Sequence, residues 1–281
     1  MTDPSSLSRE TESYPVVQRS SIRFFRRITR YWAGVFRDIG LRTYFLRDIA
    51  RALGDPATYV PETIRQMKVI GVDSIALTVI VAAFIGGVIA MLTRYQLLPG
   101  VQLSIIGLAS RLMIIPELGP LLTGLVLTGR VGARMTAEIG TMRVTEQIDA
   151  LETLAYDPVA FLVVPRLLAA TIMLPVLVVL ADAVGLYSAY FVSSYVTNVP
   201  PRDFIEGLRL GFGTFQVVYS LLKAMMFGIA IALICAYEGY ITEAGAEGVG
   251  RSTARAVVIA SVTILVLDGL TAAVLGPLLQ T

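Results

Sequence analysis

The chain has 281 residues, of which 55% are hydrophobic and only 16% are charged, whereas a soluble domain carries about 25% charged residues. This composition excludes an ordinary soluble globule. Histidine is absent and Cys235 is the single cysteine, which excludes histidine-dependent triads, histidine zinc sites and an intramolecular disulfide. The net charge of +2 divides unevenly, because residues 1–68 hold 12 Lys and Arg against 7 Asp and Glu, and the remainder holds 11 against 14.

The N-terminal 68 residues carry this basic excess. Residues 1–20 are polar and rich in Ser and Thr, and we expect a disordered cytoplasmic tail. In residues 21–68 we expect a basic amphipathic region at the membrane surface. Its first part, residues 22–39, places Phe25, Ile28 and Trp32 at steps of three and four, with arginines between them. A nucleic-acid site is the alternative, but the apolar segments that follow make lipid headgroups the nearer partner, so we expect no nucleic acid.

Five apolar segments follow, each long enough to cross a hydrocarbon core of about 30 Å. They cover residues 74–92, 103–128, 167–196, 215–237 and 256–279. In the first, Gly86 and Gly87 give either a face for close helix approach or a point where the helix breaks and re-enters. The third is too long for one core and too short for two, which predicts one long helix kinked near Pro175. The sequence therefore predicts an all-α integral membrane protein with about five transmembrane helices.

The orientation follows from the arginines that flank these segments. The N-terminal region and the connections 130–166 and 238–255 carry more of them than the connections 93–102 and 197–214. We therefore expect a multi-pass protein with the N-terminus in the cytoplasm and the C-terminus on the opposite side.

The sequence contains no phosphate-binding loop of the form GxxxxGK[ST]. We expect no ATPase site, no catalytic residues, no metal and no cofactor in this chain, and we interpret it as a non-enzyme. Energy for uphill transport would then come from an ion gradient or from another polypeptide.

The connection between the second and third segments is too patterned for a passive loop. Its apolar residues recur at helical spacing, Gly140 interrupts them, and Thr145 is a suitable N-cap for a helix whose first turn carries Glu146 and Asp149. We expect two short surface helices here. They either dock on their own bundle or present a surface to a soluble partner.

The runs ELGP, GRVGARMTAEIGTMRVTEQIDALE and DPVAFLVVPRLLA, with the later EGYITEAGAEGVGRSTARAVV, resemble the MlaE/YrbE permease family, the membrane subunits of MCE-type lipid-transport ABC systems. The resemblance covers about residues 70–281, and we assign residues 69–281 to an MlaE-like permease domain. It implies a homodimer in the bacterial inner membrane, a first helix that is partly re-entrant and a cytoplasmic coupling helix within about 131–154. It also implies a cytoplasmic ABC ATPase that binds ATP, a periplasmic MCE-domain protein and a phospholipid or related substrate; a STAS-domain protein often accompanies the ATPase. Family members often carry a basic residue where this chain has Pro116.

Two groups of candidate site residues follow. The lipid site is predicted at Leu92, Leu97, Met113, Glu117, Leu121 and Gly124, and the ATPase-coupling site at Arg130, Arg134, Glu138, Met142, Glu146 and Asp149. A charged residue inside a span is costly and needs a role. Glu117 either lies beside the lipid cavity or pairs with Arg111, and Lys223 either faces a phosphate or extends toward the outer surface.

Two other functions compete with a lipid-translocating permease. A proton-coupled secondary transporter would use Asp182 and Asp268, but inverted repeats with paired broken helices are missing from the sequence. An intramembrane aspartyl protease would use the same two carboxylates, but the expected YD and GxGD contexts are missing too. For both aspartates we favour packing or hydrogen bonding over proton coupling.

Overall fold

The computed structural model describes residues 40, 42–54, 56–243 and 245–279, and all regular elements within these ranges are helical. The chain divides into two units, residues 1–51 and 52–281. In the first unit, residues 40 and 42–51 are helical. The predicted polar tail at 1–20 and the predicted surface helix at 22–39 lie outside the described residues.

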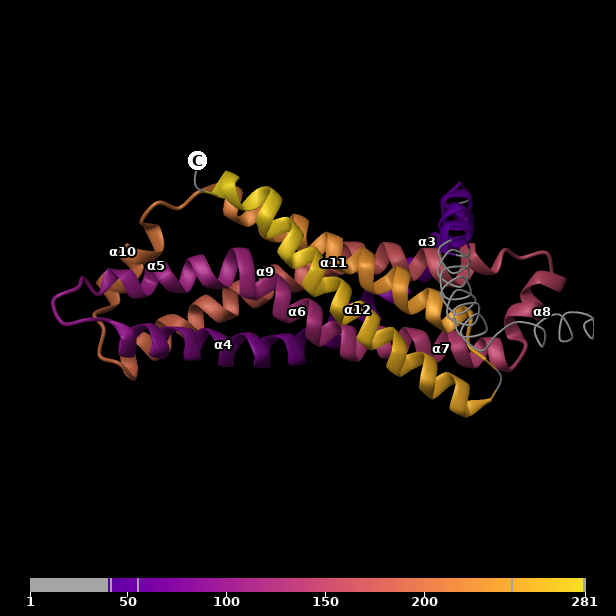
Figure 1. Cartoon of the computed structure of the whole chain (residues 1–281), viewed down its shortest axis with the longest axis horizontal. Helices are drawn as coiled ribbons and strands as arrows, with labels where there is room; N and C mark the ends of the chain where they lie inside the picture. Colours follow the sequence, from indigo (N-terminus) through magenta and orange to yellow (C-terminus); the bar gives the residue numbers. More distant parts are fainter. Residues whose placement is uncertain (1–39, 41, 55, 244, 280–281) are drawn as a thin grey trace, which may run out of the picture. The chain divides into compact units, whose positions relative to one another are not determined.

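The second unit is a series of helices joined by short connections (Figure 1). In chain order these are α3 (Pro56–Ile70), η2 (Val72–Ser74), α4 (Ile75–Gln96), α5 (Ser104–Met113), η3 (Ile114–Leu118), α6 (Gly119–Leu127), η4 (Thr128–Gly132), α7 (Ala133–Val144), α8 (Gln147–Thr153), η5 (Val159–Val163), α9 (Val164–Tyr195), α10 (Pro201–Arg209), α11 (Thr214–Tyr240), α12 (Ala246–Leu275) and η6 (Gly276–Leu279). The elements η3, η4 and η5 are single wide turns of π-helix, and η2 and η6 are 3₁₀ turns.

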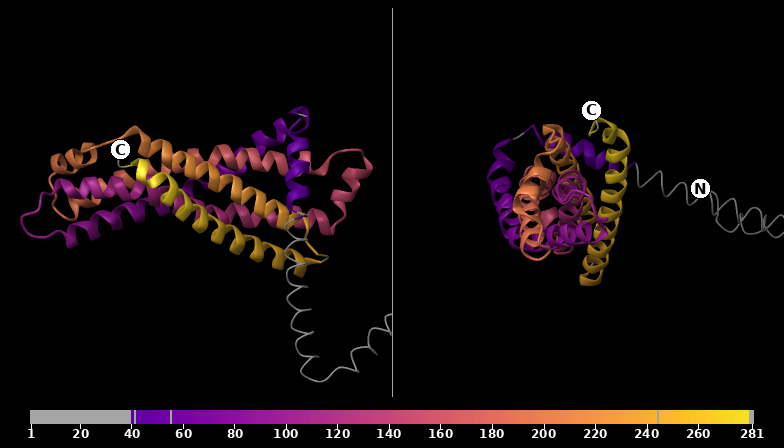
Figure 2. Two further views of the ribbon diagram at one scale, coloured as in Figure 1. Left: turned by 45° about the horizontal axis from the view of Figure 1, so that its top comes forward. Right: turned by 90° about the vertical axis from the view of Figure 1, so that its left-hand side faces the viewer.

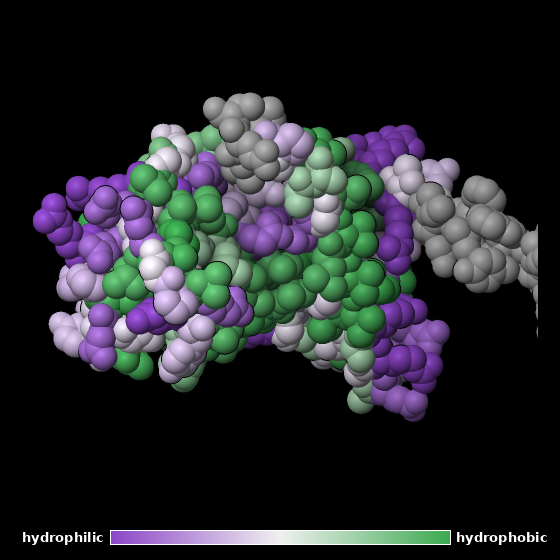
Figure 3. Space-filling view, turned by 60° about the vertical axis from the view of Figure 1, so that its left-hand side comes forward, coloured by the Kyte–Doolittle hydropathy of each residue, from purple (hydrophilic) through white to green (hydrophobic). Residues whose placement is uncertain are grey.

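Five helical runs in the described residues are long and apolar enough to cross a membrane, which confirms the predicted architecture. They cover Tyr59–Gln96, Ser104–Val144, Val159–Tyr195, Thr214–Tyr240 and Ala246–Leu275. The first and second runs are longer than the predicted segments, because α3 precedes α4 almost without interruption and α7 continues from α6. On the face drawn in Figure 3, a broad hydrophobic area lies between hydrophilic groups gathered at the two ends.

Helix α9 is the centre of the second unit, since it packs against α3, α4, α6 and α11. It runs through Pro175 as one helix of 32 residues. Gly86 of α4 crosses Gly185 of α9 so closely that a Cβ at Gly86 would collide with the Gly185 carbonyl. Of the two alternatives for the α4 glycines, close helix approach is therefore confirmed and a break is wrong: α4 is continuous, and its small residues bring two backbones together.

The two ends of the second unit differ in construction, as Figures 1 and 2 show. One end carries α8, α3 and the end of α7. The other carries α5, α10 and the C-terminal end of α12.

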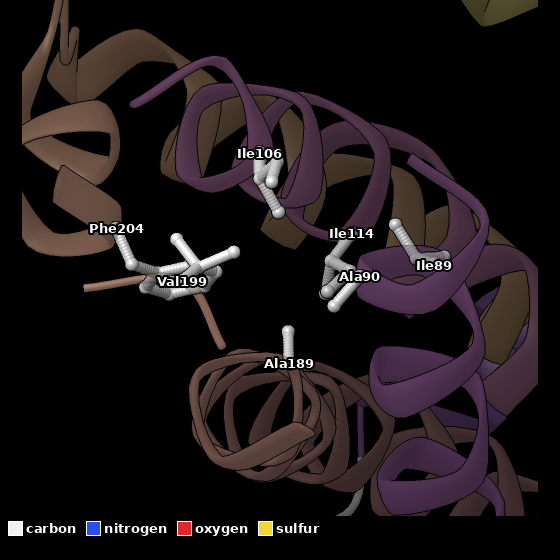
Figure 4. Close-up of a cluster of buried hydrophobic side chains, with 7 residues drawn as sticks. All are labelled: Ile89, Ala90, Ile106, Ile114, Ala189, Val199 and Phe204. Carbon is white, nitrogen blue, oxygen red and sulfur yellow. The ribbon is translucent and has the colours of Figure 1, made fainter. Parts of the chain in front are cut away.

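The end with α5 and α10 has its own apolar core. Ile89 and Ala90 of α4, Ile106 of α5, Ile114 of η3, Ala189 of α9, and Val199 and Phe204 beyond it converge there (Figure 4). Gly107 and Gly207 let α5 and α10 approach at backbone distance. Helix α10 was not among the predicted elements. Its signal in the sequence is a pair of prolines at its start and Asp203 in its first turn.

Two details of the 130–154 segment differ from the prediction. Gly140 does not interrupt a helix, because α7 runs through it; its missing side chain leaves room for Thr242, whose Oγ1 would lie 2.9 Å from a Cβ at that position. Thr145 is not the N-cap of the next helix. It ends α7, and Glu146, with a left-handed φ of 58°, precedes α8 without a side-chain cap. Only α8 is a separate short helix.

Candidate functional site

Three charged side chains from three helices meet inside the second unit. Lys223 Nζ of α11 lies 2.8 Å from Glu117 Oε2 of η3 and 2.6 Å from Asp268 Oδ1 of α12. The lysine side chain is only 1% exposed and that of Asp268 is 12% exposed, but that of Glu117 is 41% exposed. We call these three residues the charged triad. One cation faces two carboxylates, and the triad opens to its surroundings through Glu117.

The local sequence explains where Glu117 lies. Pro116 has no N–H to donate to the preceding turn, and the chain forms a wide π-turn at Ile114–Leu118. Gly119 follows directly, and a Cβ there would collide with the Asp182 carboxylate of α9. The glycine therefore lets α6 approach α9 closely beside Glu117.

Two other charged groups of the spans, Arg111 and Asp182, have partners outside the triad. Arg111 is buried and donates a hydrogen bond to the Leu210 carbonyl at 2.8 Å, so the alternative that Glu117 pairs with Arg111 is wrong. Asp182 accepts a hydrogen bond from Ser220 at 3.3 Å. Lys223 lies at the centre of the triad. The alternative that it extends toward the outer surface is therefore wrong.

The predicted lipid-site residues fall into two groups. Met113, Glu117 and Leu121 recur at four-residue steps from α5 through η3 to α6, and none of them is buried. Leu92, at the end of α4, is also exposed.

The other two predicted lipid-site residues, Leu97 and Gly124, face packed neighbours. Leu97 packs on the apolar core of Figure 4. Gly124 faces α11 and α12, where a Cβ would lie 3.1 Å from Phe227 and 3.6 Å from Ile264. A lipid role for all six residues stays a prediction.

The predicted ATPase-coupling residues also fall into two groups. Arg134, Glu138 and Met142 line a cleft between α3, α7 and the start of α9, and exposed Arg130 lies on an adjoining wall. Glu146 and Asp149 are exposed at α8, more than one turn beyond the cleft residues. Asp149 accepts a hydrogen bond from Arg143 at 2.6 Å, which ties α8 to α7.

Helix α7 is fixed to the helix that carries Lys223. Thr136 donates a hydrogen bond to the Cys235 carbonyl of α11 at 2.9 Å, and Gly239 of α11 packs on the α7 backbone. Glu238 of α11 is almost fully buried and lies 2.7 Å from Arg255 of α12. The pattern of residues in each segment did not reveal these contacts, since each joins positions far apart in the chain.

Comparison with known proteins identifies the group to which this architecture belongs. A sequence model described as permease MlaE matches residues 63–274. The chain belongs to the MlaE permease family. The chain is 36% identical over 235 residues to a probable ABC transporter permease protein of Rickettsia prowazekii, and the match covers 82% of this chain and 89% of that protein.

Two further relatives extend the comparison. The intermembrane phospholipid transport system permease protein MlaE of Haemophilus influenzae is 30% identical over 257 residues, which cover 90% of this chain and 98% of that one. The Arabidopsis thaliana chloroplastic protein trigalactosyldiacylglycerol 1 is 32% identical over 207 residues, 73% of this chain and 59% of that one. As an MlaE permease with five apolar helices, the protein is a multi-pass membrane protein.

Proposed function

We propose that this member of the MlaE permease family is the membrane subunit of an ABC transporter that moves a phospholipid or a related lipid, with ATP hydrolysed by a separate ATPase subunit. Membership of the family supports the proposal, as does the Haemophilus relative, which is named for intermembrane phospholipid transport. The absence of a phosphate-binding loop from the sequence is consistent with an ATPase on another chain and with a non-enzyme role.

The observation that carries the proposal is the half-open charged triad. A phospholipid presents apolar tails and a charged headgroup, so its path needs an apolar wall with a few polar groups. Glu117 lies between Met113 and Leu121 on one partly exposed face, with Lys223 directly behind it. A two-fold dimer would use this face twice and enclose the lipid between two copies.

The remaining features of the proposal concern orientation and partners. We place the end with α8 in the cytoplasm of a bacterial inner membrane and the end with α10 in the periplasm, following the arginine distribution. Helix α8, with Glu146 and Asp149, would contact the ATPase. A periplasmic MCE-domain protein would receive or deliver the lipid beyond α10, and a STAS-domain protein would accompany the ATPase.

A proton-coupled carrier receives less support from the geometry. Its two candidate carboxylates have separate surroundings, since Asp268 lies 2.6 Å from Lys223 and Asp182 accepts one hydrogen bond from Ser220 at 3.3 Å. No hydrogen bond or ion pair among the described residues links these two carboxylates into one proton path.

The proposal is tested by reconstituting the chain with its ATPase in liposomes and measuring transfer of a fluorescent phospholipid. We expect transfer to require ATP and to fall at least about tenfold in Glu117→Gln, which removes a charge at the site. Reversing Glu146 and Asp149 to lysine should abolish copurification of the ATPase, whereas Glu206→Lys at the opposite end should not. Transfer driven by a proton gradient without ATP would contradict the proposal.

A further inference from the structure

A cleft of about 540 Å³ opens between α3, α7 and the η5–α9 junction, apart from the charged triad. Glu117 and Glu138, which lines the cleft, are separated by 21 residues of the continuous run Ser104–Val144. At about 1.5 Å per residue this separation is about 30 Å. The cleft is therefore a second site, and its chemistry can be considered independently of the triad.

Three arginines surround this cleft. Arg166 is 7% exposed; it donates to the Leu162 carbonyl at 2.6 Å and to Glu138 at 3.3 Å, and its Nε has no acceptor among the described residues. Arg134 donates to the other oxygen of Glu138 at 2.7 Å. A single carboxylate thus serves two guanidinium groups, which leaves an excess of positive charge and of N–H donors on this side.

The α3 wall contributes one guanidinium and one carboxylate, so the cleft lining carries three arginines against two glutamates. Arg65 is 77% exposed, and its one ion pair among the described residues is a long contact of 3.5 Å with Glu62, which also accepts a shorter hydrogen bond from Gln66. Arginine N–H groups in a fixed fork suit the oxygens of a phosphate. The polar part of the cleft therefore fits a phosphate-bearing anion.

The cleft lining also has an apolar part. Val69 of α3 and Phe161 of η5 belong to it. A soluble anion has no apolar part to contact these side chains, whereas a lipid carries its phosphate next to acyl chains. This mixed lining selects a lipid phosphate over a free one.

The position of the cleft along the helices agrees with this choice. Arg166 is followed by 15 uncharged residues up to Asp182, and Arg130 and Arg134 follow the uncharged run 118–129. Helix α4 begins at Ile75, shortly after α3 ends. Three spans thus change from charged to apolar residues at the level of the cleft. Phospholipid headgroups lie at such a boundary.

We propose that this cleft binds the phosphate of a membrane phospholipid, with Arg65, Arg134 and Arg166 around the phosphate and Val69 and Phe161 along the first carbons of an acyl chain. The site stands on the cleft itself and does not require that the charged triad translocates lipid. Arg134 then serves lipid binding at the membrane surface in addition to, or in place of, contact with an ATPase.

The test uses the full chain in nanodiscs of phosphatidylethanolamine and phosphatidylglycerol, with a photo-crosslinking residue at Met142 on the cleft wall. We expect capture of phospholipid by the parent chain and about thirty-fold weaker binding in Arg65→Gln/Arg134→Gln, since each basic side chain near the surface contributes about a factor of five. The matched control is Arg251→Gln, an exposed arginine in an ion pair with Glu247 on α12, which should capture lipid as the parent does.

Four further measurements decide the interpretation. Glu138→Gln should retain or increase capture because it removes a negative charge; a loss as large as that of the arginine variant would show a structural ion cluster and overturn the site. Millimolar inorganic phosphate should not compete; equal competition would point to a soluble anion. Capture of polypeptide instead of lipid in the assembled complex would overturn the proposal as well. Lys223→Met, which should stop transport, should leave this capture unchanged.

Discussion

Replacing Lys223 by methionine removes the one cation that lies between Glu117 and Asp268. Asp268, at 12% exposure, then has no counter-charge at 2.6 Å, whereas Glu117 is 41% exposed and can turn toward its surroundings. Removing one partner of a buried ion pair costs about 3–5 kcal/mol. Since only one of the two carboxylates is buried, we expect the lower end, about 3 kcal/mol, which corresponds to a fall of about 5 °C in Tm.

The matched variant is Lys223→Met/Glu117→Gln/Asp268→Asn, in which the carboxylates are neutral amides of nearly the same size. Because a buried ion cluster can be replaced by neutral groups at little cost, its Tm should recover most of the loss. Its lipid transfer should not recover, because the charges that meet the headgroup are gone. Tm in detergent and ATP-dependent transfer in liposomes measure the two effects separately.

Two results would refute this reasoning. If Lys223→Met unfolds at the parent temperature, the lysine does not hold the carboxylates in the way the distances indicate. If the triple variant transfers lipid at the parent rate, the triad is only a structural cluster and the lipid follows another face.

Three further predictions use other parts of the fold. In intact cells, a cysteine at Glu206 in α10 should react with a membrane-impermeant reagent, whereas a cysteine at Glu152 in α8 should not. The reverse labelling pattern would contradict the proposed orientation. Gly124→Trp should overpack the contact with α11 and lower the free energy of unfolding by about 1–3 kcal/mol or more, which a fall in Tm would report. An unchanged Tm would show that this position faces open space. Arg255→Gln should lower the free energy of unfolding by about 3 kcal/mol, because it leaves buried Glu238 without this cation. Adding Glu238→Gln should restore most of this loss. Additive losses in the double variant would contradict a direct pairing.

The sequence by itself determined the fold class and the number of apolar helices. Hydropathy is a property of about 20 consecutive residues, so each span could be recognised without knowledge of its neighbours. The ELGP and GRVGARMTAEIG runs indicated the permease family in the same local way. The span limits were less well predicted, since α7 carries charged residues and yet continues the helix of α6.

Only the tertiary structure decided which groups meet. Lys223 lies 106 residues from Glu117 in the chain, and α11 brings it to a π-turn that Pro116 introduces. The cleft likewise joins Arg65 to Arg134 and Arg166 from three separate spans. Helical periodicity shows which side chains share a face, but it does not show which helix that face meets, because this depends on backbone crossings such as the one at Gly86 and Gly185.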